Sequence, residues 1–401
     1  MTKILPFKAY RYTSKAGDLS DLVMSQSTNE HISPKNTNFG MDKLLLSNDP
    51  RGLFQKWKQE GIVVQDRGTS IYTFDQKYYH NDEPIQKKGF ICKIDLSPDN
   101  ISTIREHEHV IEEGIKYHFD LLKKAAVTLH PIMGMYVDEE FELEENINKS
   151  LTRPISSITN DTGGTDTFGA ISDPHVMDKF IRLLSNKNIF LADGHHRFHA
   201  SIRYSNLNQG RDGYNSTIIY VSNMEDKNLK VFPYHRLYKG IALFYEEGFI
   251  AYLKKYFTVE PILNVDILTQ QLRSTSFKLG LITRSNKFLL TLRDDKKALL
   301  MRSIDTKKHF INFSIIKEKI LTKALKLSSG KATLEVNYET NFEYCYKAVL
   351  NGDAQLAIIS PEISTTELRI ISENRIVLPE KTTFFFPKAV SGVVFDSMEE
   401  E

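Results

Sequence analysis

Hydrophobic and polar residues follow two different periods along this chain, and stretches of the two kinds succeed one another. Residues 70–74 and 90–95 alternate with a period of two, which is typical of half-buried strands. Residues 111–126 instead repeat apolar positions at helical spacing. Asp173-Pro174 predicts an N-cap followed by proline in the first turn, and the apolar positions of 176–184 continue that helix. The pattern therefore predicts a fold of the mixed α and β class.

The rest of the chain continues the same mixture. Residues 156–169 are polar and rich in glycine, which predicts a mobile loop. Residues 383–388 and 390–395 predict a pair of strands separated by a turn. Past about Gly240 the chain is either a separate lobe or an elaboration of the first part. Further strands are expected at residues 132–137, 188–192, 217–221, 278–283, 288–292, 333–336 and 354–359, and further helices at 198–204, 243–256, 313–325 and 364–373.

Composition narrows the class of protein. The 401 residues carry 52 basic and 51 acidic side chains, and this balance argues against a protein that grips nucleic acid across its surface. The two cysteines, Cys92 and Cys345, are too few for a disulfide framework or a zinc site. No stretch has the length of a signal peptide's apolar region or of a membrane span. We therefore expect a soluble, cytoplasmic protein with no nucleic-acid partner and no membrane.

The most informative segment is Leu191-Ala192-Asp193-Gly194-His195-His196-Arg197. A short apolar strand ends here, a glycine permits a tight turn, and a helix is predicted to begin with Asp193 at its N-cap. Main-chain N–H groups and the helix dipole make such a turn an anion site, and His195, His196 and Arg197 add cationic donors. Asp193 could also orient a histidine or hold a divalent cation. Two histidines beside an arginine favour an anion-binding or catalytic site over a surface helix with a simple cap.

A second cluster, Arg105-Glu106-His107-Glu108-His109, alternates imidazoles with carboxylates. It could ligate a metal, or Glu108 could serve as a general base. A solvated charged face explains the same residues equally well.

Two weaker clusters place cations beside aromatic residues. One is Phe232-Pro233-Tyr234-His235-Arg236, which could equally be a surface turn with no ligand. The other is residues 379–388, where Lys381 and Lys388 could reach a phosphate while the three phenylalanines are typical of a hydrophobic core. The sequence contains no Walker-type phosphate loop, no dinucleotide-binding glycine motif, no nucleophile elbow and no H-E-x-x-H zinc motif. Any binding or catalysis by these clusters therefore does not depend on one of these known motifs.

These clusters, in this order, resemble the bacterial and archaeal family called "domain of unknown function 1015". The resemblance runs along nearly the whole chain, from Leu5-Pro6-Phe7-Lys8-Ala9-Tyr10-Arg11 to Ser391-Gly392-Val393. The D-G-H-H-R sequence at residues 193–197 is also similar to that of free-serine kinases in the ParB/sulfiredoxin-like superfamily, where it forms part of the nucleotide or phosphate site. The resemblance implies a ParB/sulfiredoxin-like core over residues 1–240 and a large α+β region over 241–401 that closes the same site.

The resemblance further implies a small-molecule phosphotransferase of the serine-kinase type. It would transfer phosphate between a donor, which is ATP, ADP or pyrophosphate, and the hydroxyl of free L-serine or a similar hydroxy amino acid, with phosphoserine as the product. Such a transfer needs charge neutralisation on the phosphoryl group and a base for the hydroxyl, with Mg2+ as a cofactor. The implied catalytic residues are Glu108, as the base, with Asp193 and His196. The implied phosphate ligands are Gly194, His195, His196 and Arg197, supported by the cations His235, Arg236, Lys381 and Lys388. His107 and Arg11 would contact the substrate, and Asp193 would be a ligand of Mg2+.

The chain differs from the family pattern at Thr382, where serine is common, at Glu380, where proline is common, and at three further places. Residues 20–27 stand where a P-P-Y-D segment is usual, Val110 stands where a threonine is expected, and Tyr117-His118 stands where an Asp-Arg pair is expected. These changes remove a potential base and a potential phosphate clamp, which favours a changed substrate or a weakened activity.

Two other classes of function stay open. The first is a ParB-like module that binds a nucleotide and regulates or scaffolds a partner without catalysis; a DNA-binding element would favour it, and no helix-turn-helix stands out. The second is a metal-dependent hydrolase or nuclease with its metal at His107, Glu108 and Asp193, which sensitivity to chelators would favour.

Overall fold

The computed structural model describes residues 1–24, 37–80, 83–160, 162–241, 244–272, 277–302, 320–326, 335–378 and 381–398. The chain divides into two compact units. The first unit comprises Met1–Glu106, Val110–Lys230 and Phe385–Glu401, and the second unit comprises His107–His109 and Val231–Phe384. Apart from the short stretch His107–His109, the chain therefore enters the second unit after Lys230 and returns to the first unit at Phe385. The functional division predicted near residue 240 stays a prediction.

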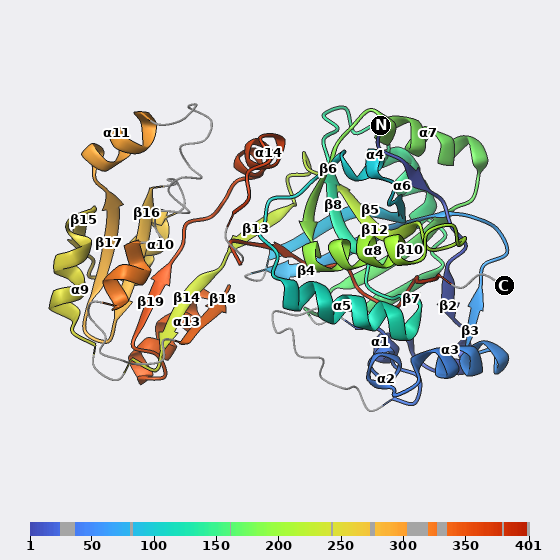
Figure 1. Ribbon diagram of the computed structural model, residues 1–401, viewed down its shortest axis with the longest axis horizontal. Coiled ribbons are helices and arrows are strands. Elements are labelled where there is room, and N and C mark those ends of the chain that lie inside the picture. The colour runs from blue at the N-terminus through green and yellow to red at the C-terminus, as the bar shows by residue number, and fades with distance from the viewer. Residues whose placement is uncertain are drawn as a thin grey trace. The chain divides into compact units, whose positions relative to one another are not determined.

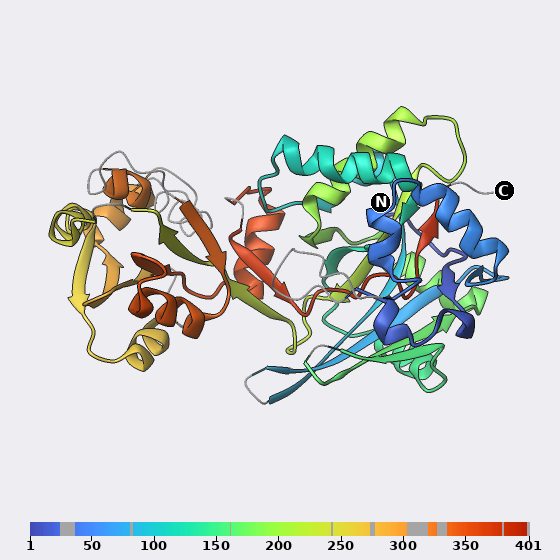
Figure 2. The same ribbon diagram turned by 90° about the horizontal axis from the view of Figure 1, so that it is seen from below.

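A mixed β-sheet forms the centre of the first unit. The strands of this unit are β1 (Ile4–Leu5), β2 (Tyr10–Tyr12), β3 (Val63–Gln65), β4 (Ile71–His80), β5 (Glu83–Asp95), β6 (Ile104–Arg105), β7 (Val127–Thr128), β8 (Ile132–Tyr136), β9 (Ser156–Thr159), β10 (Thr165–Ile171), β11 (Ile189–Asp193), β12 (Ser216–Asn223) and β21 (Asp396–Ser397). Within the described ranges the sheet has the order β6–β11–β8–β12–β5–β4–β10–β9, with β1 paired to β5. The pairs β6–β11 and β8–β12 are parallel and the other neighbours are antiparallel. Figure 2 shows the long hairpin that β4 and β5 form.

The first unit also contains helices. They are α1 (Leu19–Leu22), α2 (Met41–Leu46), α3 (Pro50–Gln59), α4 (Pro98–Ile101), α5 (Glu112–Ala125), α6 (Glu144–Leu151), α7 (Pro174–Ser185) and α8 (His195–Leu207). One large buried cluster joins Phe90 and Val221 of the sheet to Phe180 of α7 and Phe198 of α8. Figure 1 shows α5 and α8 running side by side. The start of α8 is thereby fixed between the sheet and a neighbouring helix.

The second unit is built on an antiparallel sheet. Its elements are β14 (His235–Lys239), α9 (Glu246–Leu253), β15 (Phe257–Pro261), α10 (Val265–Leu272), β16 (Lys278–Thr283), β17 (Lys287–Leu292), α11 (Asp294–Arg302), β18 (Glu335–Glu339), α13 (Phe342–Asn351), β19 (Leu356–Ile359) and α14 (Thr365–Glu373). In the part that the structure describes, the strand order is β15–β17–β16–β19–β14–β18. Leu281, Leu290 and Ile358 of the sheet pack with Phe249 of α9, which Figure 1 shows beside the sheet. A separate two-stranded sheet pairs β13 (Lys230–Pro233) with β20 (Thr383–Phe386).

The predicted mixed α and β class is confirmed. The helix predicted over residues 176–184 is α7, and Asp173 caps it by accepting a hydrogen bond from the N–H of His175. Of the helix predicted over 313–325, residues 313–319 lie outside the described residues and 320–325 are helical. The first two residues of the strand predicted over 333–336 also lie outside them.

Two predicted elements were wrong. Residues 156–169 are not a loop, because β9 and β10 pair there and β10 also pairs with β4, a long-range contact that local composition does not reveal. Residues 390–395 do not form a strand, although they are buried. Ser391 and Phe395 make only isolated bridges, to Met24 and Tyr10. The spacing of apolar residues at the C-terminal end therefore predicts correctly that these residues are buried, but it does not predict whether they pair as a strand.

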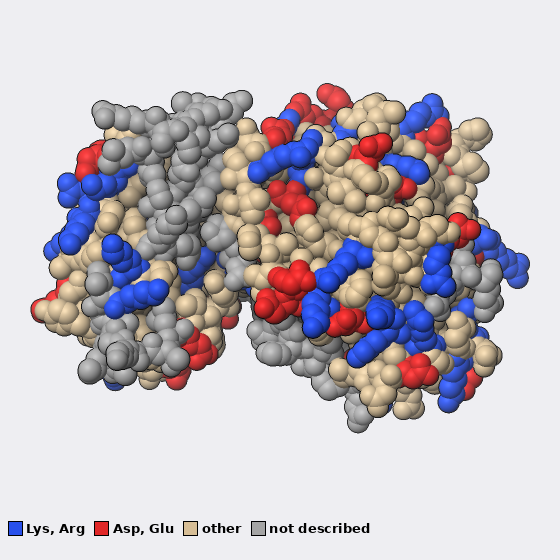
Figure 3. Space-filling model, in the orientation of Figure 1, with Lys and Arg blue, Asp and Glu red and all other residues tan. Residues whose placement is uncertain are grey.

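The face of the first unit visible in Figure 3 shows no preference for one sign of charge. On the face that Figure 3 shows, Lys and Arg side chains of the first unit are interspersed with Asp and Glu side chains, which agrees with the 52 basic and 51 acidic residues of the chain. None of the helices among the described residues is long and apolar enough to cross a membrane. The cytoplasmic location stays a prediction.

Candidate functional site

The predicted anion site lies at the end of strand β11 in the first unit. Asp193 is the last residue of β11, and Gly194, with a φ of +87°, is the N-cap of α8. A side chain at Gly194 would be strained in this left-handed conformation, and its Cβ would lie 3.0 Å from the guanidinium of Arg197. The prediction that Asp193 caps the helix was therefore wrong. Gly194 takes the cap position without any side-chain cap, and the carboxylate of Asp193 has other partners.

Asp193 holds two cations, one on each carboxylate oxygen. Its Oδ2 lies 2.7 Å from Nη2 of Arg197, and its Oδ1 lies 3.1 Å from Nζ of Lys388. Arg197 also donates from Nη1 to the main-chain oxygen of Pro131 at 2.9 Å. The three charged side chains are mostly buried, with 23% of Asp193 and 15% of each cation exposed. Burial alone would raise the pKa of Asp193, but Lys388 and Arg197 together hold it well below its usual range.

The Mg2+ site predicted at Asp193 does not fit this arrangement. Both carboxylate oxygens face side-chain cations, whereas magnesium prefers oxygen ligands that it does not share with an ammonium. Across the described ranges, no three His, Cys, Asp or Glu side chains gather closely enough to hold a metal ion. The described residues therefore do not fit a metal held by the protein at Asp193.

His196 contacts helix α5 through its ring. Its Nε2 accepts a hydrogen bond at 3.2 Å from the main-chain N–H of Ile111, the residue just before α5. A ring nitrogen that accepts carries no proton, so His196 can donate only from Nδ1. Gly114 makes this contact possible, because a Cβ there would lie 2.4 Å from Cδ2 of His196. The ring is neutral in this geometry, and its role toward phosphate, like that of the buried His195, stays a prediction.

One turn further along α8, His199 forms a pair with Glu106. Nε2 of His199 lies 2.7 Å from Oε2 of Glu106. The hydrogen bond to Glu106 raises the pKa of His199 by more than partial burial lowers it. This pair was missed in the sequence, although His199 follows His195 by four residues, which places both on one helix face.

The C-terminal segment, residues 385–398, carries Lys388 back to the first unit. Further along it, Oγ of Ser391 lies 2.5 Å from Nδ1 of His130, and burial lowers the pKa of His130 to about 3. The neutral ring of His130 is therefore a hydrogen-bond partner for the segment and not a cation. At its end, β21 pairs with β7.

A row of buried polar side chains on the sheet was missed in the sequence. Asp166 of β10, Gln76 of β4 and Lys87 of β5 are direct partners across neighbouring antiparallel strands, so they project from the same face. Their exposed fractions are 1%, 1% and 0%. A signal for Lys87 was present, because it shares the parity of the buried Ile85 and Ile91 in its strand.

Arg11, predicted to contact substrate, has a carboxylate partner within the first unit. Its Nε and Nη2 both contact Asp66, at distances down to 2.5 Å. Asp66 also accepts a hydrogen bond from the hydroxyl of Tyr72 at 2.7 Å. These bonds give Arg11 a structural role, and its contact with substrate stays a prediction.

His107 and Glu108 lie in the second unit, next to the strand-like residue Leu378. The N–H of Leu378 donates to the oxygen of His107 at 2.7 Å, and the N–H of His109 donates to Leu378 at 3.0 Å. The buried ring of His107 has its Nε2 2.9 Å from Oγ1 of Thr383. Glu108 is half-buried. Residues 379–380 of the same sequence motif lie outside the described residues.

His235, Arg236 and Lys381 lie beside aromatic rings in the second unit. Nδ1 of His235 accepts a main-chain N–H at 3.3 Å, so this ring is not a cation in this geometry. The guanidinium of Arg236, a residue that is 2% exposed, lies 5.4 Å from the centre of the Tyr338 ring. Nζ of Lys381 lies 5.6 Å from the centre of the Tyr234 ring. Both cations thus make cation–π contacts, and their roles toward phosphate stay predictions.

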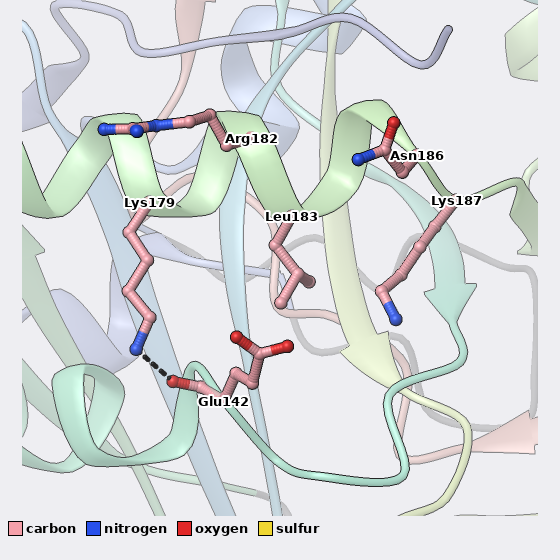
Figure 4. Close-up of a pocket in the computed structure, with 6 residues that line it drawn as sticks. All are labelled: Glu142, Lys179, Arg182, Leu183, Asn186 and Lys187. Atoms are coloured by element: carbon pink, nitrogen blue, oxygen red, sulfur yellow. Dashed lines mark hydrogen bonds between the residues drawn. The ribbon is translucent and has the colours of Figure 1, made fainter.

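A surface cavity of about 520 Å³ lies along α7 in the first unit (Figure 4). Its lining residues are Glu142, Lys179, Arg182, Leu183, Asn186 and Lys187. Lys179 donates to the main-chain oxygen of Glu142 and Lys187 to that of Val137, both at 2.7 Å. Cations near the end of a helix are favoured by its dipole without any ligand. The cavity contains none of the predicted site residues, so it adds nothing to the anion site.

The fold and the turn define a mixed α/β protein in which an aspartate at a strand–glycine–helix turn holds two cations. The chain belongs to the family described as "Protein of unknown function (DUF1015)", which matches residues 47–312. The family resemblance drawn from the sequence is thereby confirmed. The matched range contains residues 193–197 and 235–236 but not Arg11, Lys381 or Lys388. No curated protein sequence matches the chain.

Several solved structures resemble this chain at low identity. A conserved hypothetical protein from Pyrococcus furiosus has a TM-score of 0.40 at 12% identity, with 74% of this chain and 90% of that chain covered. A free serine kinase in complex with AMP has a TM-score of 0.41 at 12% identity, covering 76% and 91%. SbnI with a C-terminal truncation, from Staphylococcus aureus, has a TM-score of 0.39 at 9% identity, covering 76% and 86%.

Proposed function

We propose that this chain is a small-molecule phosphotransferase, which moves a phosphoryl group between ATP, ADP or pyrophosphate and the hydroxyl of free L-serine or a similar hydroxy amino acid. The observation that carries the proposal is the pair of cations, Arg197 and Lys388, that Asp193 holds at the start of α8. The resemblance of residues 193–197 to the D-G-H-H-R sequence of free-serine kinases supplies the substrate class. A ParB/sulfiredoxin-like core in the first unit is part of the same proposal.

The charges at this turn suit a phosphate. One carboxylate between two cations leaves a net positive charge in a site where water is mostly excluded, and an anion is attracted more strongly there than in water. The guanidinium of Arg197 has five N–H donors, of which the bonds to Asp193 and Pro131 use two. The N-terminus of α8 adds main-chain N–H groups and the positive end of its dipole.

The proposed reaction is an in-line transfer. A bond forms between the amino-acid hydroxyl oxygen and phosphorus while the bond from phosphorus to the donor's bridging oxygen breaks. The leaving group is ADP, AMP or phosphate according to the donor, and the hydroxyl proton passes to a base, for which Glu108 stays the prediction. Arg197 and Lys388 neutralise charge on the phosphoryl oxygens, which is what such a transfer needs most.

Calorimetry with pyrophosphate tests the two cations. Arg197→Met and Lys388→Met each leave Asp193 with one cation, so neither variant abandons a buried carboxylate. Each should weaken binding about tenfold or more, because a charge-assisted bond is lost. Arg182→Met is the matched control, because Arg182 pairs with Asp178 at the same spacing on the exposed face of α7, and it should change binding by less than about twofold.

Turnover is tested by incubating the protein with Mg2+, each donor and labelled hydroxy amino acids, and in reverse with phosphoserine. Phosphoserine formation that the two cation variants lose supports the proposal. Pyrophosphate binding without turnover in any combination would instead identify a non-catalytic binding module. The absence of both binding and turnover would contradict the proposal.

A further inference from the structure

Lys87 is a fully buried lysine that has no part in the transfer described above. It is 0% exposed on β5, and its Nζ lies 2.6 Å from the main-chain oxygen of Pro387. Its partner on the neighbouring strand, Gln76, donates from Nε2 to the main-chain oxygen of Lys388 at 3.1 Å. Two adjacent side chains of the sheet therefore bind two consecutive carbonyls of the C-terminal segment.

These two bonds lie at the point where the segment supplies its cation. Lys388 has its carbonyl on Gln76 and its Nζ 3.1 Å from Asp193. A lysine side chain has four rotatable bonds, so its ammonium reaches one place consistently only when its own main chain is held. Residues 387–390, which include Lys388, lie between β20 and β21 and belong to no helix or strand ladder. Side-chain bonds from the sheet take the place of that ladder.

We propose that Lys87, together with Gln76, is a positioning residue for the anion site: by holding the carbonyls of Pro387 and Lys388, it places the Lys388 ammonium at Asp193. The inference rests on the proposed function, since it takes this turn as the phosphate site. Lys87 itself does not touch the phosphate, because no part of it is exposed.

The surroundings of Lys87 support a positioning role. Burial lowers the pKa of Lys87 to about 7, while the charges of Asp166, Asp226 and Asp193 act in the opposite direction. Its Nζ also lies 5.3 Å from the centre of the Tyr220 ring. An apolar side chain of similar length would be easier to bury than an amine. A lysine at this buried position is therefore better explained by its holding of the C-terminal segment than by any contribution to the stability of the sheet.

Hydrogen exchange at residues 385–391 and pyrophosphate calorimetry test the inference in Lys87→Met and Gln76→Leu. Lys93→Met is the matched control, because Lys93 is a 7% exposed lysine of the same strand that contacts the far end of the same segment, 2.8 Å from Asp396. Exchange should become faster in the first two variants, and Lys87→Met should weaken pyrophosphate binding about tenfold. Gln76→Leu removes only a neutral bond, so it gives a smaller effect in the same direction and serves if Lys87→Met does not fold. Lys93→Met should leave affinity within about twofold.

Where turnover is measurable, the KM for the phosphate donor should rise while the KM for the amino acid stays within about twofold, a split that a general loss of stability does not produce. Unchanged exchange in both sheet variants overturns the inference, and so does equal weakening of affinity in Lys93→Met. If exchange is faster in the sheet variants but the unmodified protein does not bind pyrophosphate, the proposed phosphate site is contradicted, whereas the positioning of Lys388 by the sheet is supported.

Discussion

Replacing Lys87 with methionine should change the way the stability of the first unit depends on pH. Methionine keeps much of the length of the side chain and removes the amine. In the folded protein burial lowers the pKa of Lys87 to about 7, from an ordinary value of 10.5. In the unfolded chain the amine is exposed and returns to its ordinary value. Folding therefore releases a proton from Lys87 over the range between these two values.

The magnitude follows from the number of protons bound. Between the two pKa values the unfolded chain binds more protons than the folded chain, so this group makes stability rise with pH, by up to about 1.4 kcal/mol per pH unit. From about pH 7.5 to about pH 9.5 the rise is on the order of 2 to 3 kcal/mol. Below the folded pKa both states carry the proton, and the full cost of burying the ammonium, on the order of 5 kcal/mol, is present. Lys87→Met lacks this dependence because it has no amine.

Urea unfolding followed by the fluorescence of Trp57 measures the difference. Trp57 is the single tryptophan of the chain, is 2% exposed and lies in the first unit. The free energy of unfolding of the unmodified protein minus that of the variant should increase by roughly 2 to 3 kcal/mol over this pH range. The increase should persist in added salt, because desolvation causes most of the shift and salt screens only exposed charges. A difference that is equal at both pH values would refute the reasoning, since Lys87 would then titrate alike in both states.

Two further substitutions test the contacts of α8. Gly114→Ala should lower the melting temperature and shift the ring resonances of His196, because the new Cβ would lie 2.4 Å from Cδ2 of that ring. Alanine favours a helix by about 1 kcal/mol, so a variant more stable than the parent would show that the ring yields easily, and Gly68→Ala, with open space around it, is the control. Glu106→Gln should lower the pKa of His199 in an NMR titration, because the carboxylate that holds its proton is lost. The stability that this pair contributes is present below the ordinary histidine pKa and is lost as pH rises through the raised value, and an unchanged titration midpoint would contradict the pairing.

The parts of the fold that depend on neighbours along the chain can be predicted from the sequence. Helix α7 is predictable from Asp173-Pro174 because a cap and a first-turn proline act within one turn. Residues 390–395 show where this reasoning stops. Their apolar side chains are buried, as in a strand, but Phe395 packs against the ring of Tyr10 and the segment joins no ladder. Periodicity indicates which residues are buried and not which partners their main chain will find.

The same limit applies to the candidate site. The strand–glycine–helix turn is predictable from residues 191–197, but the partners of its carboxylate are not. Local rules assign Asp193 to the cap, whereas Gly194 takes that position and the carboxylate binds Lys388, which is far away in the sequence. Lys87 was missed for the same reason, because its function depends on a segment that the sequence places elsewhere. A buried lysine in an apolar strand position is a signal whose meaning appears only once the partner is known.

The order of segments along the chain has a consequence for the charge of the site. The main part of the second unit, Val231–Phe384, lies in sequence between the turn and the segment that supplies the turn's second cation. A first unit that ended at Lys230 would keep Asp193 and Arg197 but would lack Lys388. One carboxylate would then face one cation, and the pair would be neutral, which removes most of the attraction for an anion at that point. The net positive charge of this turn therefore depends on the return of the chain to the first unit and is not a property of the D-G-H-H-R sequence alone.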